Sequence, residues 1–239
     1  MVWQPPFELS LSESELYLLE SYIPKTKSDI RLYNSEYHES KIATVRKVAP
    51  YLSRVEAWTI SMYLGPTAYY TKINRALQGA LTNEVDKFLL IAKAATVALV
   101  KIPPVTLAYV QSLPQPDNTQ TTGLLRRYKG MSPRRMEPYQ VGEIITEPTF
   151  VSTTYWHLPF GIIQRYAENA NTVFEINITP NINGSVGRYV DPLKRRNREG
   201  EILFPPGVQF RVKERTVKDY PLTVDTVESN ITIIEMEEV

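Results

Sequence analysis

Two acidic residues separated by a glycine are the groups in this sequence best suited to chemistry. They are Glu199 and Glu201, in the segment REGEILFPPG at 198–207. Side chains alternate along a strand, so residues two apart in an extended segment project to the same side, and both carboxylates would face one substrate. Paired carboxylates can stabilise positive charge that develops on a sugar, and they can orient or deprotonate a nucleophile. A bare Glu-Gly-Glu also occurs in exposed acidic turns, so the pair needs further support.

Hydroxyl side chains form a second group, Ser152, Thr153 and Thr154, in the segment FVSTTY at 150–155. The β-branched and aromatic residues of this segment predict a strand, on which Ser152 and Thr154 share a face. Thr and Val are common in strands of every kind. The segment therefore gains meaning only together with other motifs.

A third segment, LLRRYKGM at 124–131, supplies cationic groups. In this order, the three segments resemble the motifs of the arginine-serine-glutamate class of mono-ADP-ribosyltransferases. That class carries an Arg on one strand, then a Ser-Thr-Ser strand, then a Glu-x-Glu loop. The continuation after Glu201 is similar to the family's Glu-x-Glu-Ile-Leu-x-Pro-x-Gly pattern. The resemblance extends from Val55 to Lys213 and includes the catalytic domains of bacterial binary actin-modifying toxins.

The resemblance implies NAD as the cofactor and assigns roles to the two acids. Glu201 matches the carboxylate that stabilises the oxocarbenium-like ribose when its bond to nicotinamide breaks. Glu199 matches the acid that pairs with an incoming arginine and helps to remove its proton, because a protonated guanidinium is a poor nucleophile. Relatives that modify asparagine or DNA bases typically have Gln at this position. Glu199 therefore favours arginine as the acceptor.

The hydroxyl group has roles by the same resemblance. Ser152 matches the residue that hydrogen-bonds the catalytic Glu and fixes its rotamer. Thr153 and Thr154 match the neighbours that support the nicotinamide pocket. Thr154 departs from the family's usual Ser but keeps the hydroxyl group.

The cation that would bind the NAD diphosphate is open to two alignments. Arg127 with the following residues resembles the Arg-x-x-Gly form of binary toxins, whereas Tyr128-Lys129-Gly130 resembles a Tyr-Arg-Gly form in which Lys replaces Arg. We prefer Arg127, because only a guanidinium can bind phosphate oxygens through two parallel charge-assisted bonds. Lys129 would then share the face of Arg127, and Arg126 would face away.

Two weaker matches concern the NAD cleft of the family. Tyr70 and Asn74 lie one turn apart on a predicted helix, on the same face, and resemble a Tyr-x-x-x-Asn that lines this cleft. They fit helix packing and a capped turn equally well. The segment from Tyr155 to Phe160 corresponds to the family's phosphate-nicotinamide loop, where an aromatic ring often stacks on nicotinamide. The sequence does not say which aromatic residue would do so.

Composition narrows the class of protein. The chain has 239 residues, a hydrophobic fraction of 43% and a net charge of +1. This composition suffices for one sizeable core or two small ones, and the charges form no basic stripe for nucleic acid. Absence of cysteine excludes disulfides and thiolate metal sites, and no metal site is expected. The apolar segment 88–102 contains Lys93 and is shorter than a membrane span, so we expect a buried helix and no membrane partner. A Sec-type signal peptide is not predicted at the N-terminus, and the localisation stays open.

Other enzyme classes lack their motifs. The sequence has no HExxH, no Walker loop and no Gly-x-Gly-x-x-Gly, which removes support for metalloprotease, P-loop and Rossmann interpretations. The two histidines, His38 and His157, do not occur in the setting of the diphtheria-like His-Tyr-Glu class.

The pattern of elements predicts an α+β protein. Residues 1–105 form a helical half, with a capping box from Ser12 and Glu15, and with Pro66 and Asn83 as further helix starts. Residues 106–239 form a β-sandwich half interrupted by one helix, FGIIQRYAENAN. We expect N-terminal helices packed on a two-sheet β-sandwich, in a single ADP-ribosyltransferase domain covering 1–239. The predicted strands are TFVSTTYW, TVFEINI, EILF, VQFRVKER, PLTVDTV and NITIIEM.

The predicted function is NAD-dependent mono-ADP-ribosylation of an accessible arginine on a target protein, with a toxin or effector as the implied setting. An NAD glycohydrolase, in which water replaces the arginine, is an alternative within the enzymes. A catalytically inactive binding module is an alternative of another class. The intact Arg, Ser and two Glu argue against the inactive module.

Overall fold

The computed structural model describes residues 3–24, 35–65, 69–117, 121–159, 161–178, 185–194, 199–222 and 227–239. The chain divides into two compact units. A helical unit comprises Pro5–Pro103 and Pro192–Arg196, and a sheet unit comprises Met1–Gln4, Pro104–Asp191 and Asn197–Val239. The division after Pro103 coincides with the change of composition in the sequence.

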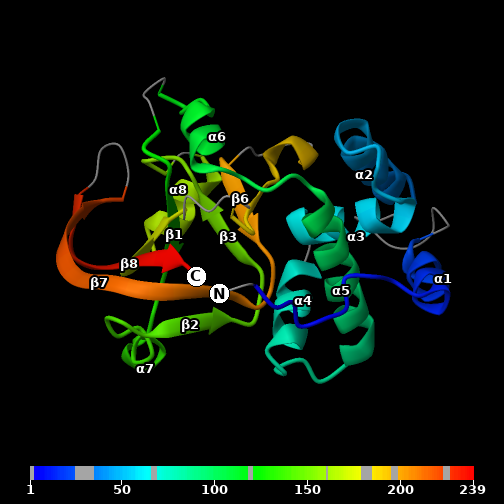
Figure 1. Cartoon of the computed structure of the whole chain (residues 1–239), viewed down its shortest axis with the longest axis horizontal. Helices are drawn as coiled ribbons and strands as arrows, with labels where there is room; N and C mark the ends of the chain where they lie inside the picture. Colours follow the sequence, from blue (N-terminus) through cyan, green and yellow to red (C-terminus); the bar gives the residue numbers. More distant parts are fainter. Residues whose placement is uncertain are drawn as a thin grey trace. The chain divides into compact units, whose positions relative to one another are not determined.

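The helical unit contains the first helices of the chain (Figure 1). The predicted capping box is present at α1, where Ser12 Oγ accepts the Glu15 backbone N–H at 3.2 Å and Glu15 accepts the Ser12 N–H at 2.8 Å. The prediction for Asn83 is wrong, because Glu84 occupies the N-cap position of α5 in a left-handed conformation and makes no side-chain cap bond. The predicted start at Pro66 lies outside the described residues. The helices are α1 (Glu13–Tyr22), α2 (Ser35–Val48), α3 (Arg54–Leu64), α4 (Tyr69–Leu77) and α5 (Val85–Lys101).

The core of the helical unit is built on α3 and α5. Trp58 on α3 is fully buried and donates its indole N–H to His38 Nδ1 at 3.0 Å. The apolar segment that was expected to be a buried helix forms α5, and most of its residues are buried. Within the described part of the chain, no helix is long and apolar enough to span a bilayer.

The sheet unit is built on one eight-stranded sheet with the order β2-β7-β8-β4-β1-β3-β6-β5. Neighbouring strands pair antiparallel, apart from the parallel pair of β4 and β8. The helices of this unit are α6 (Leu107–Ser112), α7 (Pro133–Met136) and α8 (Ile162–Ala167). The strands are β1 (Leu124–Lys129), β2 (Ile144–Glu147), β3 (Val151–Thr154), β4 (Thr172–Asn177), β5 (Arg188–Tyr189), β6 (Glu201–Phe204), β7 (Val208–Pro221) and β8 (Val227–Glu238).

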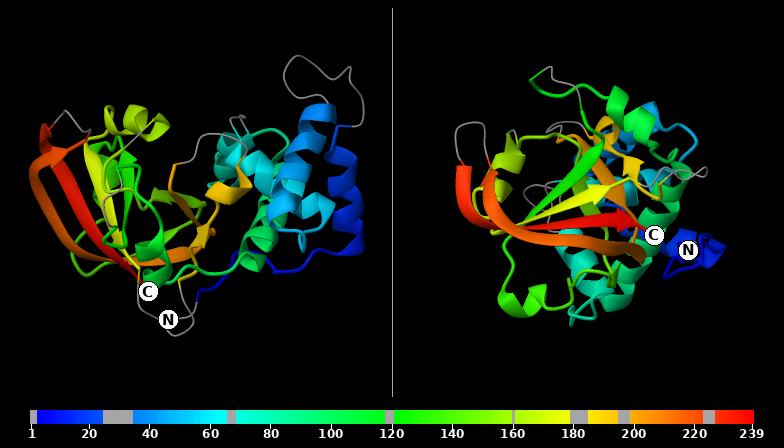
Figure 2. Two further views of the ribbon diagram at one scale, coloured as in Figure 1. Left: turned by 90° about the horizontal axis from the view of Figure 1, so that it is seen from above. Right: turned by 60° about the vertical axis from the view of Figure 1, so that its left-hand side comes forward.

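The α+β class is confirmed, but the expected pair of separate sheets is replaced by one continuous hydrogen-bonded sheet. Continuity depends on β1, which pairs with β4 along its length and with β3 through Arg126 and Thr154. Register shifts near Val212 and near Lys218 mark irregularities in the long strand β7, which curves strongly in Figures 1 and 2. Bulges of this kind bend a strand, so one sheet can fold back without breaking its ladder. Alternation in the sequence shows which residues share a face, and it does not show where a ladder ends.

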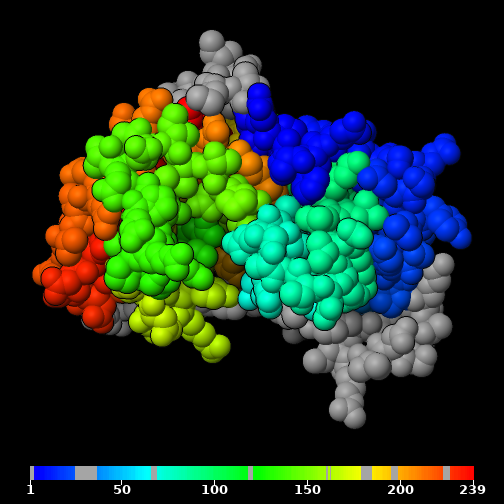
Figure 3. Space-filling model, turned by 90° about the horizontal axis from the view of Figure 1, so that it is seen from below, coloured from blue at the N-terminus to red at the C-terminus, as the bar shows by residue number. Residues whose placement is uncertain are grey.

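Both faces of the sheet bury apolar side chains. One face carries a cluster around Leu125, Phe174, Phe204 and Phe210. The other face carries a cluster around Val173 and Ile233, and α8 packs on it through Ile163 and Ala167. The short elements α7 and β2 form part of the outer surface, as the green atoms of Figure 3 show. The residues of a central strand therefore point alternately into the two apolar clusters on the two faces of the sheet.

Candidate active site

The carboxylate of Glu201 and the hydroxyl of Ser152 are brought together by two neighbouring strands. In the pairing of β3 with β6, Thr154 lies opposite Glu201 and Ser152 lies opposite Leu203. Directly opposed residues of an antiparallel pair share a face, so Ser152, Thr154 and Glu201 point to the same side. Ser152 Oγ donates a hydrogen bond to Glu201 Oε1 at 2.5 Å. Glu201 is only 5% exposed, and this contact fixes one oxygen of its carboxylate.

The backbone between the two acids differs from the extended segment that the sequence predicted. Gly200 has φ of +62°, so alternation along a strand does not apply across it, and Glu201 is the first residue of β6. The backbone N–H groups of Glu199, Gly200 and Glu201 all point to the carboxylate of Asp191. The distances are 3.1 and 3.2 Å from Glu199 N, 2.6 Å from Gly200 N and 3.1 Å from Glu201 N. Asp191 opens the 3-10 turn Asp191–Leu193 and is 2% exposed.

The carbonyl groups of the same segment are also bound. Thr154 Oγ1 donates to Glu199 O at 2.7 Å, Tyr155 N donates to Gly200 O at 3.0 Å, and Val190 N donates to Glu201 O at 3.1 Å. Every backbone N–H and C=O from Glu199 to Glu201 therefore has a partner. The backbone that carries the two acids is therefore held in a defined place before any ligand arrives.

Gly200 is also constrained by its neighbour Trp156. A Cβ atom at Gly200 would lie 2.6 Å from Trp156 Nε1 and 2.7 Å from Cδ1. The positive φ angle and the close indole both require glycine at this position. The glycine of the Glu-Gly-Glu motif is thus explained by packing as well as by conformation.

The two threonines of the hydroxyl group bind backbone atoms. Thr153 Oγ1 donates to Ile202 O at 2.8 Å, across the β3 and β6 pair. Thr154 binds Glu199 O and also accepts the Trp156 N–H at 3.1 Å. Their predicted part in a nicotinamide pocket stays a prediction.

The register of β1 places its two arginines on opposite faces, and it does so in the reverse of the expected sense. Arg126 lies directly opposite Thr154, so Arg126 shares the face of Ser152 and Glu201. Arg127, one residue later, belongs to the other face. The expectation that Arg126 faces away is therefore wrong, because a strand sequence fixes alternation but leaves open which face meets the neighbouring motif.

The guanidinium of Arg126 is engaged within the sheet unit. Its Nε donates to Tyr220 OH at 2.9 Å and lies 3.4 Å from Glu175 Oε1, and its side chain is 11% exposed. Tyr220 OH in turn donates to Glu175 Oε1 at 2.8 Å. Among the described residues, Arg126 Nη1 and the nearby Tyr128 OH are buried without a hydrogen-bond partner.

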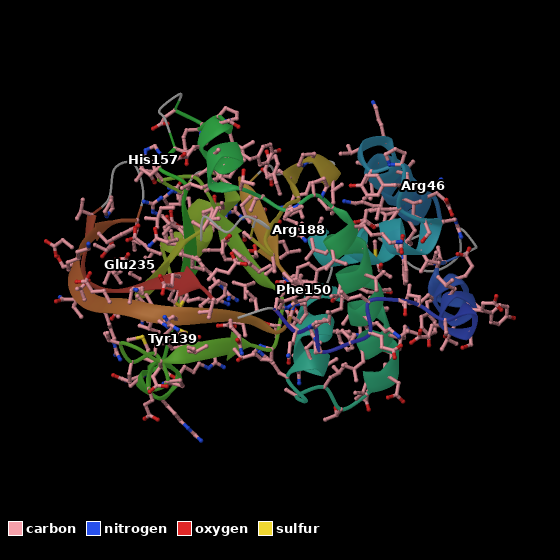
Figure 4. All side chains as sticks on the ribbon, viewed as in Figure 1. Arg46, Tyr139, Phe150, His157, Arg188 and Glu235 are labelled. Atoms are coloured by element: carbon pink, nitrogen blue, oxygen red, sulfur yellow. The ribbon has the colours of Figure 1, made fainter. Side chains whose placement is uncertain are left out.

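The guanidinium of Arg127 is held more loosely. Its Nη1 lies 3.8 Å from Glu147 Oε2 at the end of β2, and Tyr139 OH donates to Glu147 Oε1 at 2.9 Å. Burial, and after it the Glu147 carboxylate, raises the pKa of Tyr139, so the phenol keeps its proton and remains a donor. Tyr139 is labelled in Figure 4. The Arg127 guanidinium, loss of hydration and Arg135 together lower the pKa of Lys129 from 10.5 to about 8, and Glu147 opposes this shift.

The remaining predicted NAD contacts are Tyr70, Asn74 and an aromatic residue between Tyr155 and Phe160. Tyr70 and Asn74 lie on α4 in the helical unit, which forms surface in Figure 3. Tyr70 is 45% exposed, whereas Asn74 Nδ2 donates to Tyr63 OH at 3.4 Å and Asn74 Oδ1 is buried with no partner in the part of the chain that the structure describes. Phe160 lies outside the described residues. Of the aromatic side chains from 155 onward, Trp156 packs against the acidic motif.

Three residues of the site escaped the sequence analysis: Asp191, Glu147 and Tyr139. Asp191 had a partial signal, because an Asp-Pro pair is typical of a turn and lies nine residues before Gly200. Glu147 and Tyr139 had none, because their meeting with Arg127 depends on the pairing of β2 with β7 at the edge of the sheet.

Comparison with known proteins identifies the family of the chain. The model of the ADP-ribosyltransferase exoenzyme family matches residues 34–237, which is most of the chain. The chain belongs to the ADP-ribosyltransferase exoenzyme family. The family, the α+β fold and NAD as the cofactor, all predicted from the motifs, are thereby confirmed.

Individual relatives of this exoenzyme domain come from several bacteria. A stretch of 103 residues, 43% of this chain, is 37% identical to the protein named "Putative NAD(+)--arginine ADP-ribosyltransferase Mav" of Mycobacterium avium (strain 104). That match spans only 10% of the relative's length.

Two solved structures share the fold. The type III effector XopAI of Xanthomonas axonopodis pv. citri superimposes with a TM-score of 0.61 at 16% identity, covering 97% of this chain and 85% of that one. The ADP-ribosylating toxin BECa of a C. perfringens binary enterotoxin, solved with NADH, has a TM-score of 0.56 at 20% identity. The superposition covers 84% of this chain and 48% of the BECa chain.

Proposed function

We propose that this exoenzyme splits NAD and transfers ADP-ribose to an arginine side chain of a target protein, as a toxin or effector. The observation that carries the proposal is the hydrogen bond from Ser152 to Glu201, with a second acid, Glu199, held two residues earlier on a fully bonded backbone. The similarity to the protein named Mav supports arginine as the acceptor, and the similarity to XopAI and BECa supports the toxin or effector role.

Glu201 serves the sugar in this proposal. Positive charge develops on the ribose as nicotinamide leaves, and a fixed carboxylate in a water-poor position stabilises that charge strongly. Ser152 binds one carboxylate oxygen and orients the carboxylate, whose negative charge would stabilise the ribose. Because the carboxylate is already oriented, little reorganisation is required in the transition state.

Glu199 serves the acceptor. A guanidinium is protonated at neutral pH and has no lone pair ready for attack, so a carboxylate must pair with it and take up a proton. Glu199 precedes the left-handed Gly200 and is less buried than Glu201, which suits contact with an incoming protein side chain. Its position beside Glu201 allows the two acids to act on the two reaction partners.

The remaining predicted residues would bind NAD. Arg127 is our preferred partner for the diphosphate, since a guanidinium can bind two phosphate oxygens at once and, among the described residues, its ion pair with Glu147 is long, at 3.8 Å. Thr153, Thr154, Tyr70 and Asn74 complete the proposed cofactor contacts. In this proposal both compact units belong to one ADP-ribosyltransferase domain.

The test is a pair of Glu→Gln variants assayed with NAD and a small arginine analogue. Nicotinamide release and ADP-ribosyl-arginine formation are measured in parallel for the wild type, Glu199→Gln and the control Glu214→Gln, an exposed residue of β7. We expect Glu199→Gln to lose arginine modification by at least about a hundredfold while keeping most of the NAD hydrolysis. Hydrolysis should persist because the attacking water, unlike an arginine, does not need a carboxylate that pairs with a guanidinium. The control should behave as the wild type does.

The same assay separates the alternatives. Equal losses of both products in Glu199→Gln would overturn the division of roles and favour an NAD glycohydrolase. Binding of NAD by the wild type with no release of nicotinamide would favour an inactive binding module. A labelled-NAD assay on cell lysate, with Glu201→Gln as the blank, would then identify the target protein.

A further inference from the structure

We propose that Asp191 is a positioning residue of this active site, whose buried carboxylate sets the backbone of Glu199, Gly200 and Glu201 so that Glu201 meets Ser152. The proposal rests on the proposed function, because it concerns how the two acids are held for the reaction. Asp191 touches neither NAD nor the acceptor in this proposal. It acts through the backbone of the acidic motif.

The geometry is that of an anion held by successive backbone N–H groups. Both oxygens of Asp191 are used: Oδ1 accepts from Glu199 N and Glu201 N, and Oδ2 accepts from Glu199 N and Gly200 N. Successive N–H groups around a left-handed residue form a concave anion site, which elsewhere binds phosphate. Here a side chain of the same chain fills it, at 2% exposure.

A carboxylate suits this position better than any neutral side chain. An amide at position 191 would offer one acceptor oxygen, and its NH2 group would face either the Gly200 N–H or the Glu201 N–H. Two donors facing each other in a buried site leave at least one N–H without a partner, which costs free energy. Asparagine would therefore keep the volume of the side chain and remove its function.

The segment is also fixed from its other side. Trp156 leaves no room for a Cβ atom at Gly200, and Thr154 binds the carbonyl of Glu199. The glycine thus lies between the Asp191 carboxylate at its N–H and the Trp156 indole at its Cα. If the carboxylate is lost, the N–H groups turn toward other partners, and the Cα of Glu201 moves with them.

Such a movement would act on the chemistry selectively. The Ser152 hydrogen bond to Glu201 is 2.5 Å, and a displacement of about 1 Å at a catalytic group can lower the rate about a hundredfold. NAD binding depends on other contacts, among them the cations of β1. We therefore expect loss of Asp191 to lower kcat of NAD hydrolysis and to leave KM nearly unchanged.

The first test compares Asp191→Asn with Asp219→Asn, an exposed residue of β7. Nicotinamide release gives kcat and KM, and hydrogen exchange followed by NMR gives the protection of the Glu199, Gly200 and Glu201 amides. We expect Asp191→Asn to lower kcat about tenfold or more, to change KM less than about threefold, and to raise exchange at Gly200 about tenfold or more. Asp219→Asn should change none of these.

Folding of the variant does not limit the test. In the wild type itself, the Gly200 amide should exchange slowly, and exchange at the rate of an exposed amide would overturn the proposal. A second variant, Asp191→Ala, should regain activity when formate is added, because formate can supply a carboxylate to the three N–H groups. A role in general folding alone would give no such rescue.

The outcomes distinguish this proposal from the proposed function. Unchanged exchange at Gly200 in Asp191→Asn, or increased exchange with kcat within about twofold of the wild type, would overturn the role of Asp191 alone. Equal nicotinamide release by the wild type and Glu201→Gln would overturn the proposed function, and the positioning role with it. Slow exchange at Gly200 with a selective fall in kcat supports both.

Discussion

Two parts of the sheet unit are built in different ways. The acidic part consists of Glu199 and Glu201 with the residues that hold them, and the basic part consists of the cations of β1. On the acidic part, Glu201 is held by Ser152 at 2.5 Å, and the backbone around it is held by Asp191 at 2.6 to 3.2 Å. On the basic part, Arg127 has an ion pair of 3.8 Å with Glu147. Glu201 and the backbone of the acidic motif are fixed in advance, whereas the side chain of Arg127 is held by a longer ion pair.

The cations of the basic part also repel one another. Arg127 is the largest cause of the lowered pKa of Lys129, which means that the positive charge of Lys129 is disfavoured where it lies. An anion such as a diphosphate would relieve this repulsion. In the proposed function, the acidic part thus serves the transition state and the basic part serves binding of the diphosphate.

The largest expected effect is at the centre of the acidic part. Glu201→Gln removes the charge that stabilises the ribose, and it should lower both NAD hydrolysis and arginine modification by more than about a hundredfold. Binding of NAD, measured by calorimetry, should stay within about threefold of the wild type, because the substrate carries little charge at the ribose before bond cleavage. A variant that keeps a tenth of wild-type hydrolysis would show that another group stabilises the sugar.

The next effect in size is on the basic part and compares three cations. We expect Arg127→Ala to weaken NAD binding about tenfold to a hundredfold and Lys129→Ala less than about fivefold, since only the guanidinium can bind two phosphate oxygens at once. Arg126→Ala is the third member of the set, because the register places Arg126 on the face of Ser152.

The three variants distinguish two criteria for the cation that binds NAD: how loosely its side chain is held, and which face of β1 it lies on. Circular dichroism should first show that each variant is folded, because Arg126 belongs to a buried network with Tyr220 and Glu175. If Arg126→Ala loses the most NAD affinity, the face of the strand determines which cation binds the diphosphate, and our choice of Arg127 is wrong. The largest loss at Lys129 would favour the Tyr-Lys-Gly alignment.

A smaller effect is expected where the acidic part loses one contact and keeps its charge. Ser152→Ala removes the hydrogen bond to Glu201 Oε1 and should lower kcat of NAD hydrolysis about tenfold, which is typical of a bond to a charged group. Ser132→Ala is the control, because Ser132 precedes α7 and makes no cap bond there. If the Ser152 variant retains full kcat, the backbone bonds to Asp191 alone suffice to place Glu201.

The sequence predicted the hydrogen bond between Ser152 and Glu201 but not the residues that surround it. The spacing of Ser152 and Glu201 was sufficient, because each belongs to a short strand whose pattern identifies it and whose pairing brings them together. Asp191 was missed, because its role depends on the left-handed turn at Gly200, which a motif of residue types does not describe. The faces of Arg126 and Arg127 were reversed, because register is set between strands and not within one.

The fold shows the same division. Strand segments were recognised by composition, but β2 was missed because it is a short edge strand whose four residues are all exposed or only half-buried. The continuous sheet could not be foreseen either, because it depends on the single paired position of β1 and β3 and on irregularities in β7. Local patterns predict elements, and long-range hydrogen bonds decide how elements join.

The smallest expected effect concerns the pH dependence of the basic part. The pKa of Lys129 is lowered to about 8, so its charge is lost as the pH rises from 7 to 9, while the diphosphate of NAD stays ionised. If Lys129 lies near the bound diphosphate, NAD affinity should fall over this range by about twofold to fivefold, as for a charge pair that remains in contact with water.

The stability of the protein should change in the opposite direction. The unfolded chain keeps this proton up to a pKa of about 10.4, so between pH 8 and 10.4 the unfolded state binds more protons and this group makes folding more favourable as pH rises. Lys129→Met should remove both trends, and calorimetry together with thermal unfolding at pH 7, 8 and 9 measures them. An unchanged fall of NAD affinity in Lys129→Met would show that another group titrates, and that the diphosphate lies away from the end of β1.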